Sequence, residues 1–211
     1  MPGSTHLLTS SRPKQKPSII AQYFRTPGQI GAIAPSSRRL AGRMLQDVDL
    51  AAARTVVEYG PGTGAFTREI VRRLGPSTRF LAIELSPVFA RAIRQKYPHG
   101  RVQVQERSVA EVAAALRDEG LPEKGSVDVI VSGLPWAAFP LDKQREILDA
   151  TLSVLRPGGV LVTFAYQIGT MLPAGRRFAK LLPEYFARVS RSELVWMNLP
   201  PAFVLRCVKA G

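Results

Sequence analysis

Two acidic residues and three glycines form the part of the chain best suited to bind a ligand. Glu58 is followed by Gly60, Gly62 and Gly64, and Glu84 comes twenty residues after the last glycine. Glycine has no Cβ, so it adopts positive φ and lets a ligand lie against the backbone. A carboxylate such as Glu84 accepts hydrogen bonds from both hydroxyls of a ribose. This spacing is typical of the first half of a site for a nucleotide-containing cofactor.

The glycine spacing and Glu58 narrow the choice of cofactor. The dinucleotide fingerprint is G-x-G-x-x-G, with room for a pyrophosphate at a helix N-terminus, whereas this chain has G-x-G-x-G. A carboxylate at Glu58 would repel a pyrophosphate but suits a ligand that carries an ammonium group. The arrangement resembles motif I of the S-adenosylmethionine-dependent methyltransferases. A structural turn or a nicotinamide dinucleotide site is the alternative.

The elements that must position these residues alternate between strand and helix. Strands are expected at residues 55–59, 79–85, 102–106, 127–132, 160–166, 188–198 and 202–209. Helices are expected at 36–45, 65–74, from Ser86-Pro87 onward, and at 109–117, 142–155 and 175–182. This alternation predicts an α/β fold with a parallel sheet. The last two strands have no helix between them, so we expect a Rossmann-like, mostly parallel seven-stranded sheet with an antiparallel C-terminal hairpin.

Ligands of such sheets bind at the carboxyl ends of the strands, so four loops should converge there. Leu85 belongs to the loop after Glu84 and is assigned with it to the cofactor. Ser108 and Val109 stand where methyltransferases hold the adenine of S-adenosylmethionine, and many of them carry an acidic residue there. Ser108 departs from that pattern, although its hydroxyl can hydrogen-bond adenine. Capping of the following helix is an equally good interpretation.

The fourth loop, SGLPW at residues 132–136, bears on the substrate. It resembles the N-L-P-[YF] motif of the rRNA adenine dimethyltransferases, with Gly133 in place of the Asn whose side-chain oxygen holds the weakly nucleophilic adenine amine. An aliphatic amine such as ethanolamine has an sp³ lone pair once deprotonated, so positioning supplies most of the catalysis. We expect Gly133, Leu134, Pro135 and Trp136 to orient such an amine. Trp136 and Tyr23 could surround a methylated ammonium by cation–π contact; core packing is the alternative for Trp136.

Further phrases in the sequence resemble the bacterial phospholipid N-methyltransferases, which are related to the rRNA adenine dimethylases. They are GAIAPSSRRLA (31–41), EYGPGTGAFT (58–67), AIELSP (82–87) and SGLP (132–135), with Phe24 and Pro27. The resemblance covers about residues 18–210. It implies stepwise methylation of phosphatidylethanolamine towards phosphatidylcholine, with S-adenosylhomocysteine as product. An rRNA adenine N6-methyltransferase, a small-molecule N- or O-methyltransferase and an inactive cofactor-binding fold are the alternatives.

Charge points to a polyanionic partner. The chain has 29 Lys and Arg against 16 Asp and Glu, a net charge of +13, and its first 46 residues contain seven basic residues and no acidic one. Such a field favours an anionic membrane or RNA, although a solubilising basic surface is the plainer explanation. Ile19, Ile20, Tyr23 and Phe24 fall on one helical face, and the resemblance implies an N-terminal amphipathic helix that touches anionic lipid.

These patterns predict three segments. Residues 1–17 are expected to be a disordered basic tail, residues 18–46 a helical membrane- and substrate-facing segment, and residues 47–211 the S-adenosylmethionine-dependent domain. There is no secretory h-region and no apolar run long enough to cross a bilayer, so we expect a cytoplasmic protein that is peripheral on the inner face of the membrane. His6, His99 and the single Cys207 are too scattered to predict a metal site.

Overall fold

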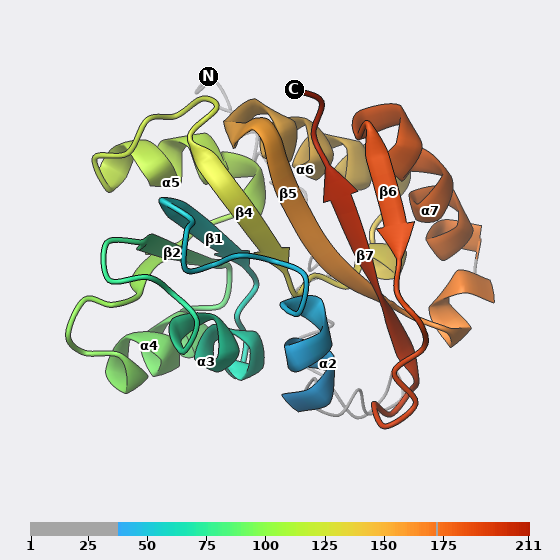
Figure 1. Ribbon diagram of the computed structural model, residues 1–211, viewed down its shortest axis with the longest axis horizontal. Helices are drawn as coiled ribbons and strands as arrows, with labels where there is room; N and C mark the ends of the chain where they lie inside the picture. Colours follow the sequence, from blue (N-terminus) through green and yellow to red (C-terminus); the bar gives the residue numbers. More distant parts are fainter. Residues whose placement is uncertain (1–37, 172) are drawn as a thin grey trace, which may run out of the picture.

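The protein consists of one twisted sheet with helices on both faces (Figure 1). It is described by a computed structural model over residues 38–171 and 173–211. The expected tail at 1–17, most of the expected segment at 18–46, and Tyr23 lie outside these residues. No helix of the described part is long and apolar enough to span a bilayer.

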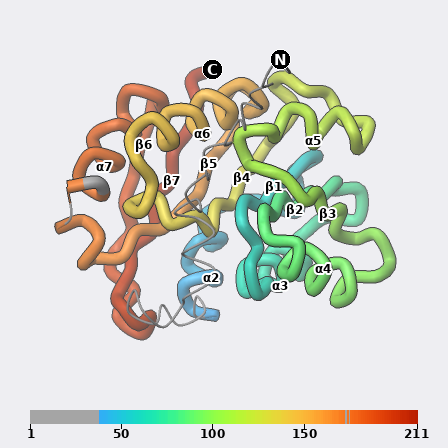
Figure 2. The backbone as a smooth tube through the Cα atoms, turned by 180° about the vertical axis from the view of Figure 1, so that it is seen from behind, coloured from blue at the N-terminus to red at the C-terminus, as the bar shows by residue number. Residues whose placement is uncertain are grey.

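The sheet confirms the expected α/β class. Its seven strands have the order β3-β2-β1-β4-β5-β7-β6, with β3 beside β2 at one edge and β6 at the other (Figure 2). The strands are β1 (Thr55–Tyr59), β2 (Arg79–Glu84), β3 (Gln103–Glu106), β4 (Val127–Ser132), β5 (Leu155–Tyr166), β6 (Arg188–Arg191) and β7 (Ala202–Val208). Strands β1 to β5 pair in parallel, and β7 is antiparallel to both β5 and β6.

Helices bury apolar side chains against each face. One face is covered by α2 (Arg38–Met44), α3 (Ala65–Val71) and α4 (Pro87–Lys96), which pack in the same core cluster as Val56. The other face is covered by α5 (Val112–Asp118), α6 (Leu141–Val154) and α7 (Pro173–Tyr185), which pack in the cluster that contains Val57. Neighbouring residues of β1 thus pack in the cores on opposite faces of the sheet, as expected for a strand buried on both sides. Three short 3₁₀ segments, η1 (Val109–Glu111), η2 (Trp136–Ala138) and η3 (Ile168–Met171), follow β3, β4 and β5.

The expected strand at 188–198 is wrong in length, because β6 ends at Arg191. The next residue, Ser192, still exchanges hydrogen bonds with Val204, but the Val204 N–H donates to the serine hydroxyl at 3.0 Å instead of to a backbone carbonyl. This replacement ends the regular ladder. Residues 192–201 form a loop that carries a cis Leu199–Pro200 bond and a single bridge between Val195 and Ala202.

Candidate active site

The glycine turn after β1 has the backbone that its sequence predicts. Gly60, Gly62 and Gly64 all have positive φ, at 65°, 52° and 81°, a region that side chains with a Cβ rarely adopt. Gly60 N–H donates to the Ile83 carbonyl of β2 at 2.9 Å, and Gly64 caps α3 in the left-handed conformation. The turn therefore joins the ends of β1 and β2 and leads directly into α3.

Glu84 closes this turn from the next strand. Its two carboxylate oxygens accept the N–H groups of Gly62, at 3.0 Å, and Ser86, at 2.9 Å. Burial raises the pKa of Glu84, and these backbone hydrogen bonds oppose that rise. Each oxygen has further lone-pair capacity, so the carboxylate fits the expected contact with ribose hydroxyls.

Glu58 is enclosed in the protein near the glycine turn. The side chain is fully buried, one oxygen accepts the Thr67 hydroxyl at 2.8 Å, and the other oxygen has no hydrogen-bond partner among the described residues. Burial raises the pKa of Glu58 to about 8, with the Thr67 hydrogen bond opposing and the charge of Glu84 adding to the rise. A buried acceptor without a donor fits a site whose ligand brings an ammonium group.

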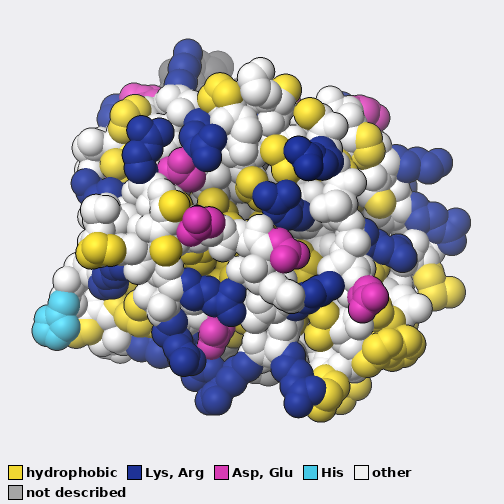
Figure 3. Space-filling model, in the orientation of Figure 1, with side chains coloured by type: hydrophobic (Ala, Val, Ile, Leu, Met, Phe, Trp, Pro, Cys, Tyr) yellow, Lys and Arg dark blue, Asp and Glu magenta, His cyan; other side chains and the backbone are white. Residues whose placement is uncertain are grey.

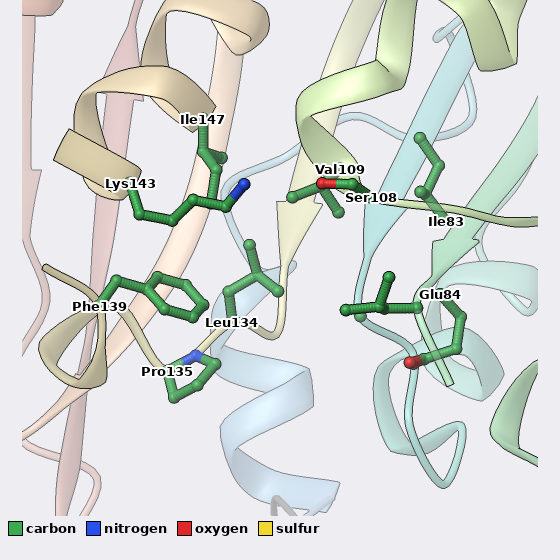
Figure 4. Close-up of a pocket in the computed structure, with 11 residues that line it drawn as sticks. Ile83, Glu84, Ser108, Val109, Leu134, Pro135, Phe139, Lys143 and Ile147 are labelled. Carbon is green, nitrogen blue, oxygen red and sulfur yellow. The ribbon is translucent and has the colours of Figure 1, made fainter. Parts of the chain in front are cut away.

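A pocket opens at the carboxyl ends of β1, β2 and β4, and Figure 4 shows its walls. Phe139, Lys143 and Ile147 lie on one side of the view, and Ile83, Glu84, Ser108 and Val109 on the other. The full lining is Gly60, Ile83, Glu84, Leu85, Ser108, Val109, Leu134, Pro135, Phe139, Lys143 and Ile147. Apolar walls with a few polar groups suit a flat heterocycle attached to a ribose.

The structure gathers most of the expected cofactor residues at this pocket. Gly60, Glu84, Leu85, Ser108 and Val109 line it, and Glu58, Gly62 and Gly64 are not among its lining residues. Of the loop expected to orient the amine, Leu134 and Pro135 line the pocket and Gly133 does not. Sequence reasoning missed Ile83, Phe139, Lys143 and Ile147. The last two are four residues apart in the first half of α6, so helical spacing just after the SGLP loop was the available signal.

Ser108 has the capping role that the sequence offered as one of two interpretations, and its position leaves the other one open. Its hydroxyl accepts the Ala110 N–H at 3.3 Å and so caps η1. The same residue also lines the pocket. A serine hydroxyl keeps a proton to donate after accepting one bond, so capping leaves it able to bind a ring nitrogen.

Gly133 lies against the glycine turn with no space for a side chain. Its N–H donates to the Tyr59 carbonyl at 2.8 Å. A Cβ added to Gly133 would lie 2.9 Å from the Gly60 carbonyl oxygen and 3.4 Å from that of Tyr59. Any larger residue would have to displace backbone, so the loop after β4 cannot present a side-chain amide from this position as it stands.

The structure corrects the expected role of Trp136. Its indole is 2% exposed and stacks on Phe178, with ring centroids 4.5 Å apart. The ring N–H donates to the hydroxyls of Ser132, at 3.2 Å, and Thr163, at 3.0 Å. These contacts occupy the indole, which packs in the core and does not line the pocket, so it is not placed to surround a methylated ammonium. The neighbouring Phe139 supplies the aromatic wall instead.

Comparison with known proteins agrees with this geometry at the level of the class. Residues 56–159 match the family model described as a methyltransferase domain. The fold is similar to that of an O-methyltransferase from Bacillus cereus in complex with S-adenosylhomocysteine, with a TM-score of 0.67 at 19% identity over 92% of each chain. The fold is that of class I methyltransferases, and the matched domain model agrees with S-adenosylmethionine as the cofactor.

Two curated relatives lie closer in sequence. An ornithine lipid N-methyltransferase from Singulisphaera acidiphila is 29% identical over 189 residues, covering 80% of this chain and 97% of the relative. A ribosomal RNA small subunit methyltransferase A from Bordetella pertussis is 32% identical over 166 residues, covering 72% of this chain. The chain spans 60% of the length of that second relative.

Proposed function

We propose that the protein transfers methyl groups from S-adenosylmethionine to the amine of a membrane lipid, while peripherally attached to the inner face of the membrane. Phosphatidylethanolamine and its mono- and dimethyl forms are the expected substrates, on the way to phosphatidylcholine. The similarity to an ornithine lipid N-methyltransferase supports a lipid amine as the acceptor.

Gly133 is the observation that carries this proposal. An adenine amine is a poor nucleophile because its lone pair is delocalised, so its methylation benefits from an acceptor that holds the amine in attacking geometry. Gly133 has no side chain, and its Cβ position lies 2.9 Å from a backbone oxygen. A deprotonated aliphatic amine needs only positioning, which a backbone loop can provide.

Each wall of the pocket has a part in that reaction. When bound, the cofactor supplies an electrophilic methyl group on a sulfonium. Glu84 would hold its ribose, Ser108 and Val109 its adenine, and the glycine turn with Glu58 its methionine part. Leu134, Pro135 and Phe139 would exclude water and orient the incoming amine.

Lys143 also favours an amine substrate. Its side chain lines the pocket and its ammonium lies 2.8 Å from the Glu146 carboxylate. A cation near the pocket disfavours the protonated form of an incoming amine and so raises the share of the nucleophilic neutral form. The same cation would attract the phosphate or carboxylate of a lipid headgroup.

Methylation of RNA is the second candidate. The similarity to a ribosomal RNA methyltransferase and the net charge of +13 favour it. Gly133 argues against it for the reason given above.

The test incubates the protein with labelled S-adenosylmethionine and, in separate reactions, phosphatidylethanolamine vesicles, ornithine-lipid vesicles and small-subunit ribosomal RNA. Chromatography then assigns the label. We expect it in N-methylated phosphatidylethanolamine. Label in ornithine lipid alone would replace the substrate but keep lipid N-methylation. Label in RNA alone, or none in any acceptor despite cofactor binding, would overturn the proposal.

A further inference from the structure

Among the residues that the structure describes, large apolar side chains are exposed along one edge of the molecule. Within the described part of the chain, the exposed large hydrophobic residues are Leu85, Val88, Leu141, Ile168, Met171, Trp196, Met197 and Leu199. Leu85 and Val88 follow β2, Leu141 follows β4 through η2, Ile168 and Met171 belong to η3 after β5, and the last three follow β6. All eight therefore lie beyond the carboxyl ends of strands that run in one direction, at the edge where the pocket opens.

The most prominent group is the tip of the β6–β7 loop, defined here as residues 196–199. Trp196, Met197 and Leu199 are 70%, 64% and 74% exposed. Figure 3 shows hydrophobic side chains at the lower right of this face, over the loop that Figure 1 draws below β6 and β7. The opposite edge of the sheet carries no exposed large hydrophobic among the described residues.

The tip is a structured loop that holds these side chains outward. Asn198 is buried between them, and its amide donates to the Pro200 carbonyl at 2.8 Å. Val195 N–H donates to the Ala202 carbonyl at 2.7 Å and closes the base of the loop. The polar residue thus points inward and the apolar ones outward, which is the reverse of an ordinary surface turn.

Arginines contact two of these apolar groups. The Arg39 guanidinium contacts the Met197 sulfur in the tip, and Arg176 donates to the Met171 carbonyl of η3 at 2.9 Å. Exposed Trp and Leu flanked by Arg are the residues that sit at a bilayer interface and pair with anionic headgroups. A protein partner would need a complementary acidic groove, whereas an anionic bilayer matches both features at once.

We propose that this carboxyl edge docks on an anionic lipid bilayer and that the tip at 196–199 inserts into it as an anchor. This inference rests on the proposed lipid substrate and deepens it. Docking by this edge would set the mouth of the cofactor pocket at the lipid surface. The anchor is separate from the N-terminal segment that the sequence assigned to membrane contact.

Two tryptophans in the chain make insertion measurable. Trp136 is buried, so Trp196 alone should respond to a change of surroundings. With full-length protein and vesicles of phosphatidylglycerol and phosphatidylcholine, we expect a blue-shifted emission and protection from acrylamide. Trp196→Phe should remove this response while the protein still binds the vesicles. Trp196 that stays open to acrylamide on saturating vesicles would overturn the proposal. So would protection in the free protein, which would mean that another segment of the chain covers the tip.

A second variant separates docking from catalysis. Trp196→Ser/Met197→Ser/Leu199→Ser should lower vesicle partitioning by about tenfold or more, since partitioning scales with buried apolar area. The matched control, Trp196→Phe/Met197→Leu, should bind vesicles as the wild type does. S-adenosylhomocysteine affinity should be unchanged in both, which also reports correct folding. Vesicle binding unaffected by the serine variant would overturn the anchor.

The same proteins distinguish failure of the inference from failure of the function. With monomeric short-chain phosphatidylethanolamine, the serine variant should methylate as fast as the wild type, because no bilayer is involved. If the tip inserts but neither the wild type nor the variants methylate any lipid, the docking proposal is supported and the proposed substrate is wrong. If the wild type and the variants all methylate the short-chain lipid but the tip does not insert, the proposed function is supported and the proposed anchor is wrong.

Discussion

Glu84 and Glu58 stand at the ends of adjacent strands, yet their surroundings give them different chemistry. Glu84 accepts two backbone N–H groups at the lining of the pocket. Glu58 is enclosed behind it, with one unpartnered oxygen and a pKa of about 8 caused first by burial. The outer carboxylate is therefore ready to accept from hydroxyls, and the inner one is mostly neutral at pH 7 until a cation approaches.

Glu84→Gln should weaken binding of S-adenosylhomocysteine by about 10- to 100-fold, because hydrogen bonds to a charged group contribute about 1.5–3 kcal/mol. Isothermal titration calorimetry measures the change. Glu106→Gln is the matched control, since Glu106 pairs with Glu84 in register from β3 and is exposed. Equal affinity in wild type and Glu84→Gln would remove the assigned role.

Glu58→Gln should change how stability depends on pH. The pKa of Glu58 in the folded protein, about 8, lies above the ordinary value of 4.5. Ionisation of Glu58 therefore has no effect on the free energy of unfolding below pH 4.5, and it lowers that free energy increasingly as the pH rises towards 8. Glutamine does not ionise and keeps an oxygen for Thr67. The free energy of unfolding of the variant should therefore rise relative to that of the wild type between pH 5 and 8, by up to about 1.4 kcal/mol per pH unit. Urea unfolding at several pH values tests this, and parallel curves would contradict it.

At the scale of elements, α6 holds the substrate-side wall of the pocket in place. Its buried Gln144 donates from one amide to the carbonyls of Trp136, at 2.8 Å, and Phe139, at 3.2 Å. Two carbonyls of the η2 loop are thus satisfied by a single side chain. The Trp136 indole, stacked on Phe178, fixes the same loop from the other side.

Gln144→Leu should lower the free energy of unfolding by about 1–3 kcal/mol, because the Phe139 carbonyl loses its donor and the Trp136 carbonyl keeps only the Phe139 N–H. It should also weaken cofactor binding, since Phe139 is no longer held. Gln167→Leu, at an exposed glutamine after β5, is the control. A destabilised variant with unchanged cofactor affinity would show that η2 is only structural.

Asp128 ties three strands together at the opposite edge of the sheet. Its carboxylate accepts the N–H groups of Arg54 and Thr55, both at 2.9 Å, and the Arg156 side chain at 2.5 Å. Burial alone would raise its pKa, but the hydrogen bonds from Thr55, Arg156 and Arg54 lower it below the ordinary value. The contribution to stability is therefore present above pH 4 and is lost as pH falls.

Asp128→Asn should lower the free energy of unfolding by about 1–3 kcal/mol at pH 7 and by much less at pH 3, where the wild-type carboxyl is itself becoming protonated. Urea titrations at the two values measure the difference. An equal loss at both would mean that charge has no part in the contact.

At the scale of the whole molecule, cofactor binding and membrane binding should respond differently to salt. The net charge is +13, and attraction between a basic surface and anionic lipid is screened as ionic strength rises. Raising salt from 0.05 to 0.5 M should weaken vesicle partitioning several-fold, with little effect on S-adenosylhomocysteine affinity. Neutral vesicles are the control. Partitioning that does not change with salt would contradict this prediction and would mean that apolar contacts, not charge, hold the protein on the vesicle.

The order of elements and the cofactor half of the site were predictable, because both depend on local spacing. The glycine turn, the position of Glu84 and the alternation of strand and helix all depend on residues that are close together in the sequence. The other wall was only partly predictable. Helical spacing places Lys143 and Ile147 on one face of α6, but the packing of α6 against the sheet decides that this face and Phe139 of the preceding loop reach the pocket. The burial of Trp136 depends in the same way on Phe178, which is distant in sequence and belongs to α7.

A crystal structure of the complex with S-adenosylhomocysteine is the sharpest test of how the cofactor is bound. We predict adenine beside Leu85, Val109 and Leu134, ribose hydroxyls on Glu84, and the amino group of the ligand near Glu58. A ligand bound elsewhere, or a ribose held by residues other than Glu84, would contradict it.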